Sequence, residues 1–344
     1  VSDHKGIFYY FHLSDPTQGK GGYDSEKLDR IVVQQSDDGG FTWTPGESIG
    51  FNHPKDQDKQ WPAVDAKGNV YVTWTEFDKY GDDNPNCMSR ILFSKSKNGK
   101  KWTAPLQVSQ TPGNCKDDDF TAEGAVPAVR TDGKVFVTWS NQNKIFFDRS
   151  YDGGATWLTN DLAIAEHAGG WDIKIPGHDR CNGMPVLVAN NSKTALNGQL
   201  YVVWADQRNG EDDTDIWFLR TSNNGDNWTA VTRVNDDEKG KHQYLPWMTV
   251  DQATGVIYIL YYDRRNYEGA ETDVYLAYST NGGNSFTNVR ISEKPFTPVE
   301  TTFFGDYLNI AAHRGIIAAI WARMDDGITS VWTAVLTQDQ LNIK

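Results

Sequence analysis

Short runs of β-branched and aromatic residues recur along the chain at regular intervals. The six copies are Ile7-Phe-Tyr-Tyr-Phe11, Val70-Tyr-Val-Thr-Trp74, Val135-Phe-Val-Thr-Trp139, Leu200-Tyr-Val-Val-Trp204, Val256-Ile-Tyr-Ile-Leu-Tyr261 and Ile316-Ile-Ala-Ala-Ile-Trp321. Such residues favour strands. A Gly or Lys-Gly turn usually precedes the run, so each copy is predicted to be the second strand of a hairpin. Six second strands predict six repeated sheets.

A polar repeat keeps step with these strands. Five segments follow the pattern Ser-x-Asp-x-Gly-x-Thr-Trp or a variant of it, and they begin at Ser36, Ser96, Ser150, Ser222 and Ser279. The Asp or Asn is expected to cap a tight turn, the Gly to take positive φ, and the final aromatic residue to pack back on the sheet. The copies at Ser96 and Ser222 are one residue short. The repeat places this turn between the third and fourth strands of each unit.

A short strand precedes each second strand, often with a proline near its start, as in Trp61-Pro-Ala-Val and Val126-Pro-Ala-Val. We therefore predict an all-β fold, a six-bladed β-propeller of four-stranded antiparallel blades, as a single domain. The predicted blades are residues 1–50, 61–110, 125–163, 184–233, 245–292 and 304–344. The first blade lacks a visible inner strand, which upstream sequence or the C-terminal tail would supply. The last blade has a third strand at Val331–Leu336 but no Ser-x-Asp turn.

Charge narrows the range of partners. The 344 residues carry a formal net charge of −13 at pH 7, and an acidic surface repels nucleic acid and anionic lipid. It also disfavours a polyanionic substrate unless a local basic pocket overrides the overall field. No apolar run approaches the roughly 18–20 residues of a membrane span. No signal peptide is visible, and the chain begins at Val1 as a mature or trimmed protein would. We expect a monomer that is secreted, periplasmic or on the cell surface.

Cysteine and acidic residues suggest little metal chemistry. Cys87, Cys115 and Cys181 lack metal-ligand spacing. A Cys87–Cys115 disulfide would fit an oxidising compartment, and three free thiols are the alternative. The runs at residues 82–86, 117–119 and 211–215 offer oxygen ligands for a structural calcium ion, but none has EF-hand spacing. No cofactor is required by the predicted chemistry.

The candidate site is predicted where the inner strands of the blades begin. These strands lie nearest the axis of a propeller, so the residues just before them would line one central mouth. They are Asp58, Lys59, Gln60, Glu123, Arg180, Asn182, His242, Gln243, Tyr244, Asp306 and Tyr307. Convergent carboxylates, an arginine, a histidine and tyrosines are typical of a glycan-processing site.

Each of these residues also has a structural interpretation. Glu123 is either an acid or base with a pKa raised by burial, or a solvated loop carboxylate. Arg180 either clamps a carboxylate or pairs with Asp179 or Asp172. His178 and His242 are expected to form loop hydrogen bonds more often than to act as catalysts.

An Asp-x-Arg motif occurs in two adjacent blades, at residues 205–209 with Asp215, and at residues 262–266 with Asp273. An Arg after one strand and an Asp before its partner favour a cross-strand ion pair. The functional alternative is that Arg208, Arg265 and Arg323 approach one another and bind an acidic sugar.

The Ser-x-Asp repeats and the blade count make the whole chain resemble the bacterial sialidase-like (BNR, Asp-box) proteins. That resemblance implies a glycoside hydrolase with a tyrosine nucleophile, a glutamate partner, an aspartate acid/base and three carboxylate-binding arginines. It places the tyrosine on the inner strand of the last blade, which Tyr307 matches. The Arg-Ile-Pro motif that carries the family's first arginine is absent from this chain.

We therefore predict a carbohydrate-active protein, a sialidase-like glycosidase acting on terminal and acidic sugars. Its catalytic residues would be Tyr307, Glu123 and Asp58. The predicted substrate-binding residues are Arg180, His242, Tyr244, Arg208, Arg265 and Trp61. One alternative is a non-catalytic glycan-binding propeller, with Trp61, Tyr244 and Phe304 stacked on sugar rings. The other is a polysaccharide lyase that acts on uronates with His242 or Tyr244 as its base.

Overall fold

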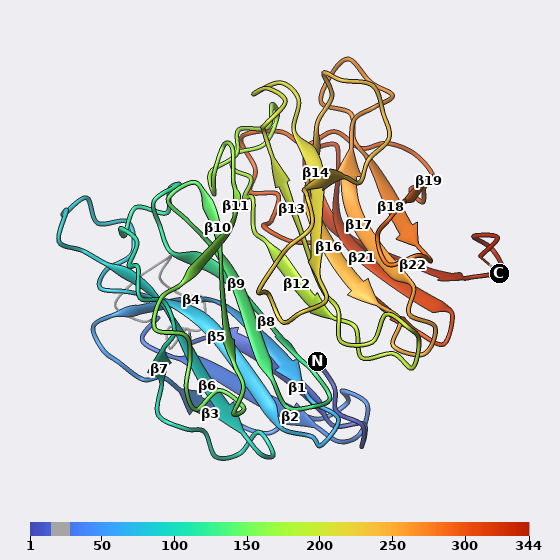
Figure 1. The fold of residues 1–344 in the computed structure, drawn as a ribbon. Helices are drawn as coiled ribbons and strands as arrows, with labels where there is room; N and C mark the ends of the chain where they lie inside the picture. The colour runs from blue at the N-terminus through green and yellow to red at the C-terminus, as the bar shows by residue number, and fades with distance from the viewer. Residues whose placement is uncertain (15–27, 344) are drawn as a thin grey trace. The chain divides into compact units, whose positions relative to one another are not determined.

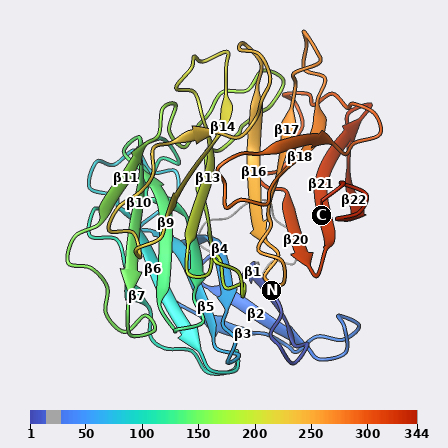
Figure 2. The same ribbon diagram turned by 45° about the vertical axis from the view of Figure 1, so that its right-hand side comes forward.

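The protein is a six-bladed β-propeller built from antiparallel sheets (Figure 1, Figure 2). The computed structural model describes residues 1–14 and 28–343, and these residues contain strands, turns and loops but no helix. None of them therefore belongs to a helix that could cross a lipid bilayer. The chain divides into two compact units, Val1–Ile164 and Ala165–Lys344, with the boundary inside β11.

Three sheets make up the first unit. Their strands are β1 (Phe8–Leu13), β2 (Ile31–Ser36) and β3 (Glu47–Ile49); β4 (Asp56–Val64), β5 (Val70–Phe77), β6 (Ser89–Ser96) and β7 (Leu106–Gln107); and β8 (Glu123–Val129), β9 (Val135–Asn141), β10 (Lys144–Ser150) and β11 (Leu162–Glu166). Strands that follow one another in the chain are neighbours in each sheet, so every blade is a meander.

The second unit contains the other three sheets. Their strands are β12 (Val186–Ala189), β13 (Leu200–Asp206), β14 (Asp215–Thr221) and β15 (Thr232–Arg233); β16 (Gln243–Val250), β17 (Ile257–Asp263), β18 (Asp273–Ser279) and β19 (Thr287–Arg290); and β20 (Asn309–His313), β21 (Ile316–Asp325) and β22 (Ile328–Thr337). The described residues after β22 form no strand.

The six predicted second strands are confirmed as β1, β5, β9, β13, β17 and β21. In the described residues the first sheet contains only β1, β2 and β3. One prediction was wrong. The inner strand of the last blade begins at Asn309, so Tyr307 lies in the loop before β20 and not on the strand.

The core follows the second strands of the blades. Every residue of β5, β9, β13 and β17 is buried, on both faces of its sheet. The motif tryptophans Trp74, Trp139 and Trp204 have no exposed surface. Runs of apolar residues without alternation are therefore explained by strands that are covered on both sides. In the last blade, by contrast, β21 alternates between exposed and buried residues.

The repeated turns share one hydrogen-bond pattern. In the third blade the Ser150 hydroxyl donates to Asp152 and accepts the Gly154 N–H at 2.7 Å, while Asp152 accepts the N–H and the hydroxyl of Thr156. Ser36 and Asp38 make the same bonds in the first blade. The turn is therefore held by side chains that satisfy its backbone donors.

The copy in the fourth blade differs from the sequence prediction. Its hydroxyl comes from Thr221 and not from Ser222, because the Thr221 hydroxyl donates to Asn223 and accepts the Gly225 N–H. Counted from Thr221, this turn has the full spacing of the pattern. Threonine supplies the same hydroxyl as serine, which a search for serine alone overlooks.

The glycine of the turn in the third blade gives a stability prediction. Gly154 has φ +82°, and a Cβ there would lie 2.2 Å from Phe93 Cζ; Gly133 has φ +84° with nothing within 4 Å. Alanine is strained at both positions because it disfavours positive φ. Only Gly154→Ala also places a Cβ too close to a core side chain. We expect Gly154→Ala to lower the free energy of unfolding by about 1–3 kcal/mol more than Gly133→Ala. Urea unfolding of both variants measures the difference, and equal losses would contradict the packing argument.

Candidate functional site

The first strands of three blades carry the same irregularity. In β4, β8 and β16 one extra residue interrupts the ladder: Asp58 pairs with Thr75 and Trp61 with Thr73; Glu123 with Ser140 and Val126 with Thr138; Tyr244 with Tyr262 and Trp247 with Leu260. Such bulges bend a strand and re-aim side chains, often beside active sites. Three predicted site residues, Asp58, Glu123 and Tyr244, thus hold equivalent positions in their sheets.

Backbone conformation accompanies each bulge. The residue after the equivalent position has positive φ in all three strands: Lys59 (54°), Gly124 (73°) and Leu245 (50°). Glycine adopts this conformation freely, whereas lysine and leucine are strained in it. The same local geometry is therefore kept even where the residue type disfavours it.

Glu123 is a buried carboxyl group in the first unit. It has no exposed surface, and neither of its carboxyl oxygens has a hydrogen-bond partner. Its ion pair is with Lys59, whose Nζ lies 3.5 Å from Oε1. Burial, reinforced by the nearby Asp117 carboxylate, raises the pKa of Glu123 well above its usual range. Glu123 therefore keeps its proton to a higher pH than an exposed glutamate does.

Asp58 shares the same lysine. Its Oδ2 lies 3.3 Å from Lys59 Nζ, and its Oδ1 accepts the Lys59 N–H at 2.7 Å. The Asp58 side chain is 22% exposed, whereas that of Glu123 is fully covered. One ammonium group thus joins two carboxyl groups in different environments, and only Asp58 of this pair reaches solvent.

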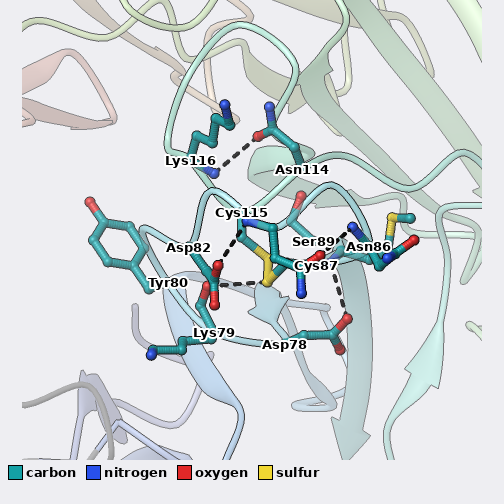
Figure 3. The surroundings of a disulfide bond; sticks show 12 residues. Asp78, Lys79, Tyr80, Asp82, Asn86, Cys87, Ser89, Asn114, Cys115 and Lys116 are labelled. Atoms are coloured by element: carbon teal, nitrogen blue, oxygen red, sulfur yellow. Dashed lines mark hydrogen bonds between the residues drawn. A yellow bond between two sulfur atoms is a disulfide. The ribbon is translucent and has the colours of Figure 1, made fainter.

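Two loops bring a tyrosine and a third carboxylate to this cluster. Of the two alternatives that the sequence left open, the structure has the Cys87–Cys115 disulfide, which links the loop after β5 to the loop after β7 (Figure 3). The Gly81 N–H donates to the Cys115 carbonyl at 2.7 Å, next to the disulfide. The Tyr80 hydroxyl donates to Asp117 Oδ2 at 2.5 Å. Burial and the hydrogen bond to Asp117 raise the pKa of Tyr80.

A second group of polar residues lies in the second unit. His178 Nε2 and the Tyr244 hydroxyl are 2.9 Å apart, and Tyr244 also hydrogen-bonds Thr272 at 3.1 Å. Burial, and then the charge of Arg264, lowers the pKa of His178 to about 3. His178 is therefore neutral, and its place in a hydrogen-bonded loop agrees with the structural interpretation.

Arg264 lies within this second group. It is 2% exposed, stacks 5.2 Å from the Tyr244 ring centre, and donates to the Pro176 carbonyl at 2.6 Å and the Thr272 hydroxyl at 3.1 Å. No carboxylate among the described residues pairs with it. A buried guanidinium without a counter-ion is a costly arrangement unless other dipoles satisfy it.

Arg180 and Tyr307 lie near the same loop. Arg180 makes a two-point ion pair with Asp306, with Nε 2.9 Å from Oδ1 and Nη2 2.5 Å from Oδ2. Asp306 was not among the partners that the sequence suggested, and Asp172, one of those partners, pairs with Lys174. The guanidinium lies 5.1 Å from the centre of the exposed Phe303 ring. Tyr307 follows Asp306 in the chain and is half-buried.

Each arginine of the set suggested for an acidic sugar pairs with an aspartate of its own blade and also contacts a residue outside its sheet, namely Glu166, Asp236 or Glu293. Arg208 pairs with Asp206, Arg265 with Asp263, and Arg323 with Asp325. Each also lies over an aromatic ring of the neighbouring strand, Trp217, Tyr275 or Trp332, at 4.3–4.4 Å. The expected cross-strand partners were wrong: Asp215 accepts from Asn209 and Asn235, and Asp273 from Tyr267 and Ser292. Each arginine thus pairs with the aspartate two residues away in the chain, because side chains two residues apart in an extended segment point to the same side.

Two further predicted residues have structural settings. His242 Nδ1 lies 3.1 Å from the Thr214 hydroxyl, and burial lowers the pKa of His242 to about 4. Trp61 is half-buried on β4, three residues after Asp58.

The structure thus brings Asp58 and Glu123 together in the first unit, and gathers His178, Tyr244 and Arg264 in the second. Several residues of these groups were missed or underrated in the sequence. Tyr80 stood in no motif, and Asp117 was considered only as a calcium ligand, although the cysteines between them, Cys87 and Cys115, could have indicated that their loops meet. Arg264 stands beside Arg265 in the repeated motif, and nothing in the sequence separates the two.

The described residues offer no metal centre. No group of three or more His, Cys, Asp or Glu side chains among them is arranged to hold a metal ion. Residues 117–119, predicted as calcium ligands, are engaged otherwise: Asp117 accepts from Tyr80, and Asp118 accepts from the side chain of Asn114.

Sequence comparison gives this protein no relatives. No family model matches the chain. No curated protein matches it either.

Solved structures do match it. The NanB sialidase of Streptococcus pneumoniae superposes with a TM-score of 0.59 at 10% identity, over 99% of this chain and 68% of that one. The intramolecular trans-sialidase of Ruminococcus gnavus gives a TM-score of 0.54 at 10% identity, over 92% and 89% of the two chains. An α-L-arabinofuranosidase of Fusarium graminearum gives 0.56 at 11%, over 99% and 92%.

The likeness is one of fold. Sialidases and related propeller glycosidases share the six-bladed architecture with this chain, as the repeats predicted. At identities near 10% the superposition does not transfer a substrate or a catalytic residue.

The buried carboxyl group gives a prediction about pH. Because its pKa is raised in the folded state, Glu123 stabilises the fold below the ordinary glutamate pKa, and this contribution is lost as the pH rises toward the folded pKa. Glu123→Gln removes that loss. We expect the variant to gain stability relative to the parent protein between pH 4.5 and 7.5, by at most about 1.4 kcal/mol per pH unit. Urea unfolding at both pH values measures this, with exposed Glu47→Gln as the control; a pH-independent difference would contradict the assignment.

Proposed function

We propose that this protein is a glycoside hydrolase whose reacting groups lie in the first unit, at the cluster of Asp58, Lys59, Tyr80, Asp117 and Glu123. The hydrogen bond between Tyr80 and Asp117, beside the Asp58–Lys59–Glu123 group, carries the proposal. A nucleophile within hydrogen-bond reach of a base, next to a carboxyl group that can act as an acid, is the arrangement that glycosyl transfer to an enzyme needs.

The roles follow from exposure and contacts. Tyr80 oxygen would attack the anomeric carbon while Asp117 takes the phenol proton. Asp58, which reaches solvent, would give a proton to the leaving sugar oxygen as the glycosidic bond breaks. Water would then attack the anomeric carbon and give a proton to Asp58, while the bond from Tyr80 to that carbon breaks and Asp117 returns its proton to the phenolate. Glu123 has no exposed surface, so we place it as a positioning residue that holds Lys59 and not as a group that touches sugar.

Tyr307 remains the rival nucleophile. It stands close to the position that the sialidase resemblance implies, and it follows Asp306, the partner of Arg180. A tyrosine suits a sugar that carries a carboxylate, because a neutral nucleophile is not repelled by it. Substitution of each tyrosine by phenylalanine distinguishes the two.

The test uses a panel of nitrophenyl glycosides and a methylumbelliferyl sialoside. We expect Asp58→Asn and Tyr80→Phe each to lower kcat by about 10²–10⁴-fold without loss of folding. Glu47→Gln and Tyr10→Phe are matched controls on exposed residues and should keep full activity. Full activity in Tyr80→Phe with loss in Tyr307→Phe would move the nucleophile to the second unit. If the parent protein cleaves no glycoside of the panel, the hydrolase proposal fails.

Glycan binding without catalysis is the second candidate function, and one observation favours it. Arg180 is fixed by Asp306 yet 38% exposed, and it lies against the exposed Phe303 ring. An oriented cation beside an aromatic face can bind an acidic sugar with no reacting group present. The lyase reading is less favoured, since Tyr244 is completely buried and His242 is bound to Thr214.

Binding of sialyllactose, measured by calorimetry, tests this second candidate. Arg180→Gln should weaken binding by about tenfold, since a charge-assisted contact is lost. Arg208→Gln serves as the control, because Arg208 is held by Asp206 in its own blade. Equal affinity in the parent and in Arg180→Gln would rule out this surface.

We further propose that the protein works outside the cytoplasm, secreted, periplasmic or on the cell surface. The Cys87–Cys115 disulfide supports this location, because structural disulfides persist in oxidising compartments. We also propose that the repeated turns belong to the Asp-box class. The matching hydrogen bonds of the turns that begin at Ser36 and Ser150 support this assignment.

A further inference from the structure

Lysines gather at one end of the first unit, although the chain as a whole carries a net charge of −13. They lie in the turn after β4, at the end of β6, in the repeated turn after β6 and near the N-terminus. The set is Lys5, Lys67, Lys95, Lys97, Lys100 and Lys101. Three of them replace the small and acidic residues that the repeated turn carries in other blades.

Two cavities open among these lysines. The first, of about 450 Å³, lies between the repeated turns of the first and second blades and is lined by Lys5, Lys67, Lys97 and Lys100. The second, of about 500 Å³, lies between the second and third blades and is lined by Lys67, Lys95, Lys97 and Lys101. Lys67 and Lys97 line both cavities, so the two form one basic region.

Five carboxylates line the same cavities: Asp3 and Asp37 the first, and Asp65, Asp132 and Asp152 the second. Asp3 accepts the N–H groups of Lys5 and Ile7. Asp65 accepts from Asn69 and the Tyr71 hydroxyl, and Asp152 accepts from Ser150 and Thr156. Asp132 pairs with Arg130 and Lys134, outside the set. Among the described residues, none of the six lysines forms an ion pair. Lys95 donates to the Gly153 carbonyl at 2.6 Å, and the others project from exposed positions.

The remaining lining is suited to a sugar. Trp43 and Tyr151 border the first and second cavities with 42% and 53% of their surfaces exposed. Thr42, Asn98 and Thr103 add short polar side chains. Exposed aromatic faces beside hydroxyl and amide groups contact sugar rings, while free ammonium groups attract anions.

We propose that this basic region is a binding site for an anionic saccharide, through its sulfate or carboxylate groups. The site is separate from the proposed reacting groups: Asp58 lies near the start of β4 and Lys67 beyond its end, so the two sites are at opposite ends of one sheet. It would hold a charged glycan chain on the protein whether or not the first unit cleaves sugars. An acidic protein needs such a local field to bind a polyanion at all.

Calorimetry with four defined probes tests the proposal on the full chain. They are a heparin hexasaccharide, trigalacturonate, maltohexaose and a single-stranded DNA 12-mer. We expect the heparin hexasaccharide or trigalacturonate to bind, more weakly at higher salt, and maltohexaose not to bind. Whichever anionic sugar binds tells whether sulfate or carboxylate is the recognised group. The double variant Lys97→Gln/Lys100→Gln should lose about tenfold or more in affinity.

The matched control is Lys193→Gln/Lys239→Gln, which changes the net charge equally at exposed lysines of the second unit. It should leave binding unchanged. If the control variant lost as much affinity, the loss in Lys97→Gln/Lys100→Gln would be due to overall charge, and the proposed binding site would be wrong. Equal binding of maltohexaose, absence of binding by both anionic sugars, or tighter, Lys97-dependent binding of the DNA would each overturn the assignment to an anionic saccharide. None of these results depends on whether the protein hydrolyses glycosides.

Discussion

A β-bulge of one extra residue near the start of the first strand decides which side chains three of the blades direct toward the candidate site. Side chains along a strand alternate between faces, so a shift by one residue reverses every side chain beyond it. In β4 and β8 the residues after the bulge, such as Val64 and Val129, stay in register with the core. The residues before it, Asp58 and Glu123, point toward a shared polar cluster. Lys59 takes a left-handed conformation at this point and is held there by both carboxyl groups. Strain of this kind persists where surrounding contacts over-determine it, which is common at functional sites.

The first unit separates its charges along the strands. Carboxyl groups collect where β4 and β8 begin. Lysines that form no ion pair among the described residues line two cavities near the turns beyond the ends of these strands, together with five aspartates. A net charge of −13 gives no sign of this division. Local fields matter for binding because screening limits each charge to about 10 Å of its surroundings at ordinary ionic strength. A protein that is acidic overall can therefore still attract an anionic glycan at one end.

The second unit shows how a shared fold can differ in its chemistry. The arginines that the repeated motif suggested, Arg208 and Arg265, each pair with an aspartate two residues away and stack on an aromatic ring. These contacts stiffen the ends of the hairpins. Arg264, next to Arg265, instead lies buried beside Tyr244 with no carboxylate partner among the described residues. Neighbouring residues of one type are thus separated by their surroundings, and a fold shared with sialidases leaves the reaction to be decided by such details.

The sequence by itself determined the architecture. Runs such as Val135-Phe-Val-Thr-Trp139 and the Ser-x-Asp turns encode strand and turn through local propensities, and their repetition gave the number of blades. It also singled out Asp58, Glu123 and Tyr244 just before the predicted inner strands, although the structure places them within β4, β8 and β16. Only the tertiary structure decided which polar groups meet. Tyr80 with Asp117, Arg180 with Asp306 and the lysines of two different turns are distant in sequence or lack a motif, and no local preference relates them. The tertiary structure also decided the protonation of Glu123, because its raised pKa is caused by other strands and loops that cover its carboxyl group.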